Sequence, residues 1–139
     1  MDVYERYRSL KLAASFCEHA HESEGRWTLL RCYRGIIFSA FPAILRTMDL
    51  FVLVTDAIGI APQVLRVDLV DPERLLLGRD EPSLWQDSAQ LRGSEFQGVY
   101  TARYTVPARP IRHAGRYDLH MEVDEHLVDL ASLHLKGRP

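Results

Sequence analysis

Cysteine is scarce in this sequence, and its scarcity excludes a disulfide-stabilised scaffold. Only Cys17 and Cys32 occur among the 139 residues, whereas small secreted domains that depend on disulfides carry several cysteine pairs. So low a cysteine content fits a reducing compartment. The protein is therefore expected to be cytoplasmic.

Long apolar runs and an excess of basic charge are also missing. No stretch approaches the roughly 18 to 20 apolar residues that a membrane span needs. The first six residues lack the basic and then apolar segments of a secretion signal. A formal net charge of −2 gives no basic surface for nucleic acid or for an anionic membrane. The sequence therefore predicts neither kind of partner.

What the sequence does contain is a regular alternation of apolar and polar residues, which is clearest over 117–123. A period of two with one polar face is typical of an antiparallel strand packed on one side. An apolar return follows Asp124-Glu125, so residues 110–135 are predicted to close the domain as a β-hairpin. Leu130 and Leu133 differ in parity, and a bulge just after Leu130 is predicted to keep both on the core side.

Gly115 and Tyr117 mark the entry to this hairpin. Gly115 permits a tight corner in the backbone. A tyrosine at the start of a late strand can donate its hydroxyl to a nearby backbone group, as in the tyrosine corner of Greek-key sandwiches. The alternative is a buried Tyr117 whose hydroxyl simply lies at the rim of the core.

Other segments show similar patterns. Asp2 to Leu10 is either one or two helical turns with Asp2 as the N-cap or a frayed leader. The apolar run 48–55 predicts a central strand that is covered on both faces, and Pro42 indicates a sheet edge or a crossing between sheets. Further strands are predicted over 10–21, 27–38, 64–70 and 96–106, with a short edge strand over 75–77.

These predictions together indicate one all-β domain. Residues 1–9 are its leader or short helix, 10–136 form the domain, and 137–139 are a C-terminal tail. About seven to eight short strands, with at most short helical turns between them, favour an antiparallel β-sandwich that is immunoglobulin-like. An apolar content of 47% suffices for one core.

Residues 78–93 form the longest polar stretch and are predicted to be a loop, with a helical turn near 80–85. Leu84 and Trp85 in this loop are candidates for protein binding, because a long loop on a rigid sandwich is a common recognition element and an aromatic side chain a common anchor. Alternatively, both side chains cover the open end of the sandwich.

Four residues resemble a set of metal ligands: Cys17, His19, His21 and, across a predicted hairpin, Cys32. If the chain turns at Glu24-Gly25, Cys17 lies opposite Cys32 and shares a face with His19. These ligand types suit zinc, but residues four apart on a strand lie about 13 Å apart, too far to share one ion. Cys17, His19 and Cys32 would therefore need a fourth ligand. Small core thiols are the default and a cross-strand disulfide is another alternative.

No catalytic residue and no cofactor is predicted. His120 is expected to face Asp129 in the closing hairpin, and the two side chains would resemble a catalytic acid–base pair. No nucleophile motif or phosphate-binding loop accompanies them. A cross-strand surface pair is the simpler interpretation. The acidic cluster of Asp124, Glu125, His126 and Asp129 lacks the ligand spacing and the glycine of a calcium loop, so a solvated turn is expected there.

A series of short motifs runs through both halves of the chain. The first half contains Phe16-Cys17-Glu18-x-Ala20, a turn at Gly25, Gly35-Ile36 and Phe41-Pro42. The second half contains Leu65-Arg66-Val67-x-Leu69-Val70-Asp71, Gly115-x-Tyr117 and Leu133-x-Leu135. In these motifs, which span about 11–136, the sequence resembles small bacterial proteins that are classed only as a domain of unknown function. The resemblance implies a β-sandwich in a bacterial cytoplasm and no established activity.

Two classes of function follow from this. The leading hypothesis is a non-catalytic module that binds another protein, or a second copy of itself, through its loops, Trp85 or an exposed strand edge. The alternative is a metal- or small-ligand-binding protein that uses Cys17, His19 and Cys32. An enzyme would require a concave polar pocket near His120 or 78–93. A monomer or a weak dimer through an edge strand is expected.

Overall fold

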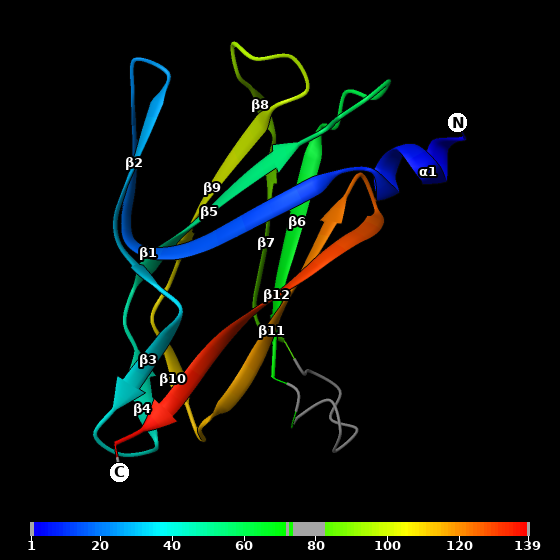
Figure 1. Ribbon diagram of the computed structural model, residues 1–139. Helices are drawn as coiled ribbons and strands as arrows, with labels where there is room; N and C mark the ends of the chain where they lie inside the picture. Colours follow the sequence, from blue (N-terminus) through cyan, green and yellow to red (C-terminus); the bar gives the residue numbers. More distant parts are fainter. Residues whose placement is uncertain (1, 72, 74–82, 139) are drawn as a thin grey trace.

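The structure is a computed structural model that describes residues 2–71, 73 and 83–138 (Figure 1). These residues form twelve strands and one short helix, α1 (Val3–Arg8). The prediction of an all-β protein is thereby confirmed. Within the described part of the chain, no helix has the length and the apolar character that crossing a membrane requires.

Helix α1 begins after Asp2, whose carboxylate accepts a hydrogen bond from the Glu5 amide at 2.8 Å, as expected for an N-cap. With six residues the helix is too short to be stable alone. Tyr7 attaches the helix to the closing hairpin, because its ring stacks on His126 at a centroid distance of 4.1 Å and its hydroxyl donates to Asp124 Oδ2 at 2.8 Å.

Five strands form the first sheet. In chain order they are β1 (Lys11–Ser23), β2 (Arg26–Tyr33), β5 (Met48–Thr55), β8 (Arg92–Gly93) and β9 (Tyr100–Val106). They are arranged in the spatial order β2-β1-β5-β9-β8, and all neighbours are antiparallel. Strand β5 lies in the middle and is buried along nearly its whole length, as its apolar run predicts.

The second sheet also has five strands. They are β3 (Gly35–Phe38), β6 (Val64–Val70), β7 (Ser83–Gln90), β11 (Gly115–Val123) and β12 (His126–Gly137). Their spatial order is β3-β12-β11-β6-β7, and β3 runs parallel to β12 while the other pairs are antiparallel. Between β2 and β3 the chain crosses from the first sheet to the edge of the second, and it passes Pro42 on its return from β3 to β5 of the first sheet. Two short strands, β4 (Ala43–Leu45) and β10 (Arg109–Ile111), form a separate pair.

One apolar core lies between the two sheets, which curl around it as a half-barrel (Figure 1). Alternate residues of β6 and β11 point inward, as the period of two predicts. On β6 these are Leu65, Val67 and Leu69, and on β11 they include Leu119 and Met121, all of them buried. A smaller cluster on the outer face of the first sheet contains the buried residues Cys17, Ala20 and Phe51.

Tyr117 at the start of β11 is buried, and its hydroxyl donates to the backbone carbonyl of His113 at 2.9 Å. The predicted bond from this tyrosine to a nearby backbone group is therefore confirmed. The ring of His113 stacks on Tyr117 with the centroids 5.7 Å apart. Gly115 between them has a φ of +148°, a conformation that residues with a side chain rarely adopt.

The register of the closing hairpin differs from the prediction by one residue. A bulge at Val128 leaves this residue unpaired, so Met121 pairs with Asp129. His120 therefore lies opposite Leu130, and the predicted pairing of His120 with Asp129 is wrong. The bulge was expected after Leu130, where the parity of the leucines changes, but it occurs closer to the turn.

The predicted loop over 78–93 is wrong for its described part, because residues 83–90 form β7 and residues 92–93 form β8. Strand β7 is an edge strand whose outer side is polar, so its sequence shows little apolar alternation. The predicted edge strand at 75–77 and the first part of the predicted helical turn, 80–82, lie outside the described residues. Residues 83–85, which were expected to complete that turn, belong to β7 instead.

Candidate functional site

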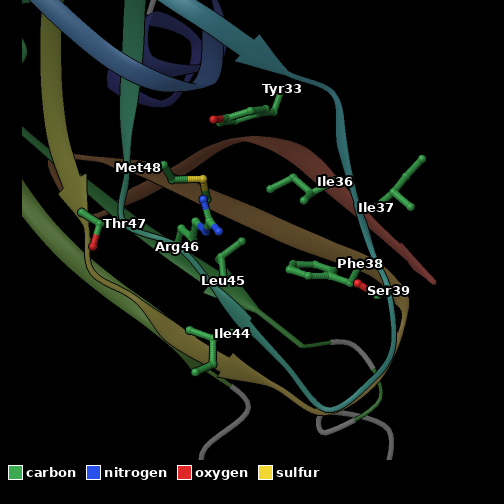
Figure 2. A pocket seen from close by; sticks show the side chains of 10 residues that line it. All are labelled: Tyr33, Ile36, Ile37, Phe38, Ser39, Ile44, Leu45, Arg46, Thr47 and Met48. Carbon is green, nitrogen blue, oxygen red and sulfur yellow. The ribbon is translucent and has the colours of Figure 1, made fainter. Parts of the chain in front are cut away.

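A cavity of about 340 Å³, lined by both apolar and polar groups, lies beside β3 and β4 at one end of the molecule. Residues 33, 36–39 and 44–48 line it, and Figure 2 shows their side chains. Two adjoining segments supply these residues: the chain that leaves β2 and forms β3, and the chain that forms β4 and enters β5. The cavity therefore lies where the chain changes sheets.

Strand β3 presents different side chains on its two faces. Ile36 and Phe38 point inward and pack against the core, whereas Ile37 points outward and is 66% exposed (Figure 2). Ile44 on β4 is 67% exposed as well. Two large aliphatic side chains are therefore in solvent beside the same cavity, which is unusual for a strand pair that otherwise contributes to the core.

The side of β3 that faces away from β12 is unpaired in the part of the chain that the structure describes. The amide of Arg138 donates to the Phe38 carbonyl at 2.8 Å, so Phe38 directs its backbone groups toward β12. Backbone groups of successive residues in a strand point to opposite sides. The N–H and C=O of Ile37, and those of Gly35, therefore point toward the free edge.

Gly35 allows β3 to approach β12 closely. A Cβ atom at this position would lie 2.9 Å from the backbone oxygen of His134, which is closer than Cβ atoms in proteins approach other atoms. Because the obstructing atom belongs to the backbone of the neighbouring strand, rotation of a side chain cannot relieve the contact. The position of the free edge thus depends on a residue without a side chain.

The surroundings of this edge carry basic charge. A shallow hollow of about 430 Å³ adjoins β3, and Arg34, Ile37 and Lys136 are among the residues that line it. Arg46 is the charged residue that lines the cavity beside β3 and β4. No acidic side chain is among the lining residues of either hollow. The edge is therefore apolar along the strand and basic around it.

A second cavity of about 410 Å³ lies between the β1–β2 hairpin and strands β7, β8 and β9, and we call it the polar cavity because imidazole and charged side chains are among its lining residues. His19, His21 and Arg103 line it. Beside it is Asp49, which is 4% exposed. The Asp49 carboxylate accepts hydrogen bonds from the Ala20 amide at 2.8 Å and from Arg103 Nη2 at 3.1 Å, and it lies 3.3 Å from His19 Nδ1. The buried negative charge is thus compensated by several donors.

The predicted metal ligands are only partly brought together. Cys17 pairs with Cys32 and His19 pairs with Leu30, as predicted, but Cys17 is buried while Cys32 is exposed. Burial raises the pKa of the Cys17 thiol, and the nearby Cys32 and Asp49 raise it further. A protonated thiol is a poor metal ligand. Among the described residues, no group of three or more potential ligands comes close enough to hold a metal.

The predicted protein-binding pair is not an exposed anchor. Trp85 is 6% exposed and packs edge-on against Tyr104 in the core, with the ring centroids 5.8 Å apart. Leu84 is partly buried and packs against the same core. Both side chains belong to edge strand β7 and pack against the core from there. Sequence reasoning missed Ile37 and Ile44, since apolar residues in a strand pattern are ordinarily expected to be buried.

The fold, the β3 edge and the cavity beside Asp49 define a small all-β protein with one apolar strand edge and one polar cavity. The chain belongs to a family of unknown function (DUF6941), whose model matches residues 12–136. This agrees with the resemblance in the sequence motifs. No curated protein matches the sequence.

Two solved structures have a distant similarity to this chain. One is a β-glucosidase from Listeria innocua in complex with glucose, with a TM-score of 0.47 and 11% identity over 92% of this chain and 16% of that chain. Another is the Pseudomonas fluorescens alkylpurine DNA glycosylase AlkC bound to DNA containing an abasic site analogue, with a TM-score of 0.42 and 16% identity over 92% of this chain and 30% of that chain. The chain thus spans less than a third of either protein, and at these TM-scores the likeness carries no functional argument.

Proposed function

We propose that this protein is a non-catalytic binding module of the bacterial cytoplasm, which takes up an extended segment of a partner protein as an additional strand on β3. The observation that carries the proposal is the free, apolar edge of β3 beside the cavity shown in Figure 2. Extended peptides bind sheet edges through backbone hydrogen bonds, and pockets for alternate side chains supply the specificity.

In the described part of the chain, the outer edges of β2, β7 and β8 are protected, which supports β3 as the binding edge. Proteins block strand edges with charge, with polar side chains or with short strands. Strand β7 exposes Gln86 and Asp87, β8 is only two residues long, and β2 exposes Arg26 and Arg31. Strand β3 has no charged side chain and exposes an isoleucine instead.

The chemistry around β3 indicates the kind of partner. A strand added beside Ile37 would direct its alternate side chains to the two faces of the sheet, where it would meet apolar walls. The charged groups on the rim are Arg34, Arg46 and Lys136, all of them basic. Charge complementarity therefore favours an extended segment in which apolar residues alternate with acidic ones.

Two further parts of the proposal concern lineage and compartment. An immunoglobulin-like origin is supported by the bond from the Tyr117 hydroxyl to the His113 carbonyl, which has the form of a tyrosine corner. A reducing cytoplasm is supported by the low cysteine content.

The experiment is a selection of linear peptides from a displayed library on the purified full chain. We expect the enriched peptides to alternate apolar and acidic residues and to bind Ile37→Lys at least tenfold more weakly than the unmodified chain. Leu130→Lys is the matched control, because Leu130 is 57% exposed on β12 and receives the same added charge. Peptides that bind Ile37→Lys normally would refute the proposal.

The same variants test whether the occupant of the edge is a second copy of the chain. Light scattering at two concentrations distinguishes a monomer from a dimer. A dimer that is lost in Ile37→Lys and kept in Leu130→Lys would mean that the partner at β3 is a second copy of the chain and not a foreign peptide. A dimer that persists in both variants would assign self-association to another surface.

A second candidate function is the binding of a small ligand in the polar cavity beside Asp49. Of the three residues predicted for this role, His19 lines the cavity, whereas Cys17 is buried and Cys32 points to solvent. A ligand in this cavity would meet imidazole and guanidinium groups rather than thiols. The chemistry of the site therefore differs from the one that the sequence predicts.

A further inference from the structure

Two histidines on β1 share one face of the strand. His19 and His21 are two residues apart, and side chains with this spacing point to the same side. Both line the polar cavity, and their rings are nearly parallel, with the centroids 6.0 Å apart and 19° between the planes. Both histidine side chains are exposed to solvent.

This spacing is close to what a shared metal ion requires. Imidazole nitrogens bind zinc at about 2.0 to 2.1 Å, which puts the centroids of two rings on one tetrahedral ion roughly 5 Å apart. The observed separation of 6.0 Å exceeds this value by about 1 Å. Rotation about the side-chain bonds of exposed rings closes such a difference without moving the backbone.

Asp49 supplies the support that metal-binding histidines usually have. Its Oδ2 atom lies 3.3 Å from His19 Nδ1, which leaves the Nε2 atom of His19 for the cavity. A carboxylate at the second nitrogen fixes the tautomer and the orientation of a metal-ligating imidazole. Asp49 is itself held in place by the Ala20 amide and by Arg103.

The charges around the histidines do not exclude a cation. Arg103 is paired with Asp49 at 3.1 Å, and Arg92 is within 3.8 Å of Glu22. Each arginine beside the cavity therefore has an acidic partner. These four charges sum to zero, so a divalent cation at the two imidazoles meets no net repulsion from them.

We propose that His19 and His21 form a site for a late first-row divalent cation, with Asp49 as a positioning residue behind His19. Imidazole suits Cu²⁺, Ni²⁺ and Zn²⁺, and Cu²⁺ binds tightest in this series. Two protein ligands leave the other coordination positions to water or to a further ligand, which distinguishes this site from a closed structural zinc site. The site is separate from the β3 edge, and metal binding there does not depend on the strand addition proposed for β3.

The test is a calorimetric titration of the full chain with Cu²⁺, Ni²⁺ or Zn²⁺ alone, after removal of metal with a chelator. One ion is expected per chain, and Cu²⁺ is expected to bind most tightly. His19→Ala and His21→Ala should each lower the affinity at least tenfold, and Asp49→Asn should lower it by about 10- to 100-fold. Electron paramagnetic resonance of bound Cu²⁺ should show two nitrogen ligands, and one in either histidine variant.

Two controls separate this site from other possible ligands. His120→Ala removes a histidine from a strand of the second sheet, and Cys32→Ser removes the exposed thiol. Both variants should bind Cu²⁺ like the unmodified chain. Unchanged binding in His19→Ala and His21→Ala, or a loss confined to Cys32→Ser, would overturn the proposal. If circular dichroism shows that Asp49→Asn is unfolded, the two histidine variants still decide the question.

Discussion

At the scale of single residues, Tyr117 shows which contacts a sequence can predict. Its hydroxyl bonds to the carbonyl of His113, four residues earlier in the chain. A contact this local follows from a tyrosine placed at the start of a strand and from Gly115 before it. The stacking of His113 on the same ring depends on the path of the intervening backbone, and no feature of the sequence indicates it.

We expect Tyr117→Phe to lower the free energy of unfolding by about 1 kcal/mol, because it removes one hydrogen bond and leaves the His113 carbonyl without this donor. Urea denaturation measures the change. Tyr4→Phe is the control, since Tyr4 is exposed and its ring is kept; it should unfold like the unmodified chain. Equal stability of all three proteins would mean that the hydroxyl bond contributes nothing.

His113 lies between several acceptors. Its Nε2 atom is 2.9 Å from Asp71 Oδ2, and its Nδ1 atom is 2.9 Å from the Ala114 carbonyl and 3.1 Å from Glu73 Oε2. The bond to Ala114 raises the pKa of His113 most, burial opposes it with the next largest effect, and Asp71 and Glu73 raise the pKa further, so that the net change is upward. The protonated imidazole is therefore favoured in the folded state.

A raised pKa predicts how stability depends on pH. The contribution of His113 is fully present below the unfolded pKa of about 6.5 and is lost as the pH rises through the higher folded value. We expect His113→Gln to be more destabilised relative to the unmodified chain at pH 6 than at pH 8. Urea denaturation at both values measures the two differences. A difference that grows with pH would contradict the assignment.

At the scale of elements, the strands that the sequence predicts best are those with strong patterns. The apolar run 48–55 and the alternating run 64–70 become β5 and β6 with the predicted bounds. Strand β7 was predicted to be a loop because an edge strand keeps a polar outer side. The parallel pairing of β3 with residues 134–137 of β12 joins segments about 100 residues apart, and no local pattern encodes it.

The same limit applies to the candidate site. The sequence indicates an exposed strand edge as one possible binding surface, and Pro42 indicates a crossing between sheets nearby. It does not show that Ile37 and Ile44 are exposed, because the topology of the whole chain decides which side of β3 and β4 is covered. For His19 and His21, the spacing predicts a shared face, but their contact with Asp49 depends on the pairing of β1 with β5.

Strand β3 should detach from β12 when Gly35 gains a side chain. We expect Gly35→Ala to lower the free energy of unfolding by about 1 to 3 kcal/mol, because its Cβ atom would press on the His134 backbone. Peptide binding at the edge should weaken as well. Gly93→Ala on edge strand β8 is the control, since its Cβ atom would make ordinary contacts. Matching stabilities of the two variants in urea would contradict this account of β3.

At the scale of the whole molecule, two curled sheets pack around one core (Figure 1), and the edges of these sheets differ in the charge and polarity of their side chains. The formal net charge is −2, yet the charged groups around β3 are Arg34, Arg46 and Lys136. Acidic residues thus lie mainly elsewhere on the chain. This separation of charge would guide an acidic segment toward the β3 end rather than toward the rest of the surface.

The most direct test of binding at β3 is amide hydrogen exchange of the full chain, measured free and with a selected peptide. The Ile37 amide points to the unpaired edge, so it should exchange fast in the free chain and slowly in the complex. Amides of β2 and β7, on the other edges, should not change. Protection that appears on β2 or β7 while Ile37 continues to exchange fast would contradict the account.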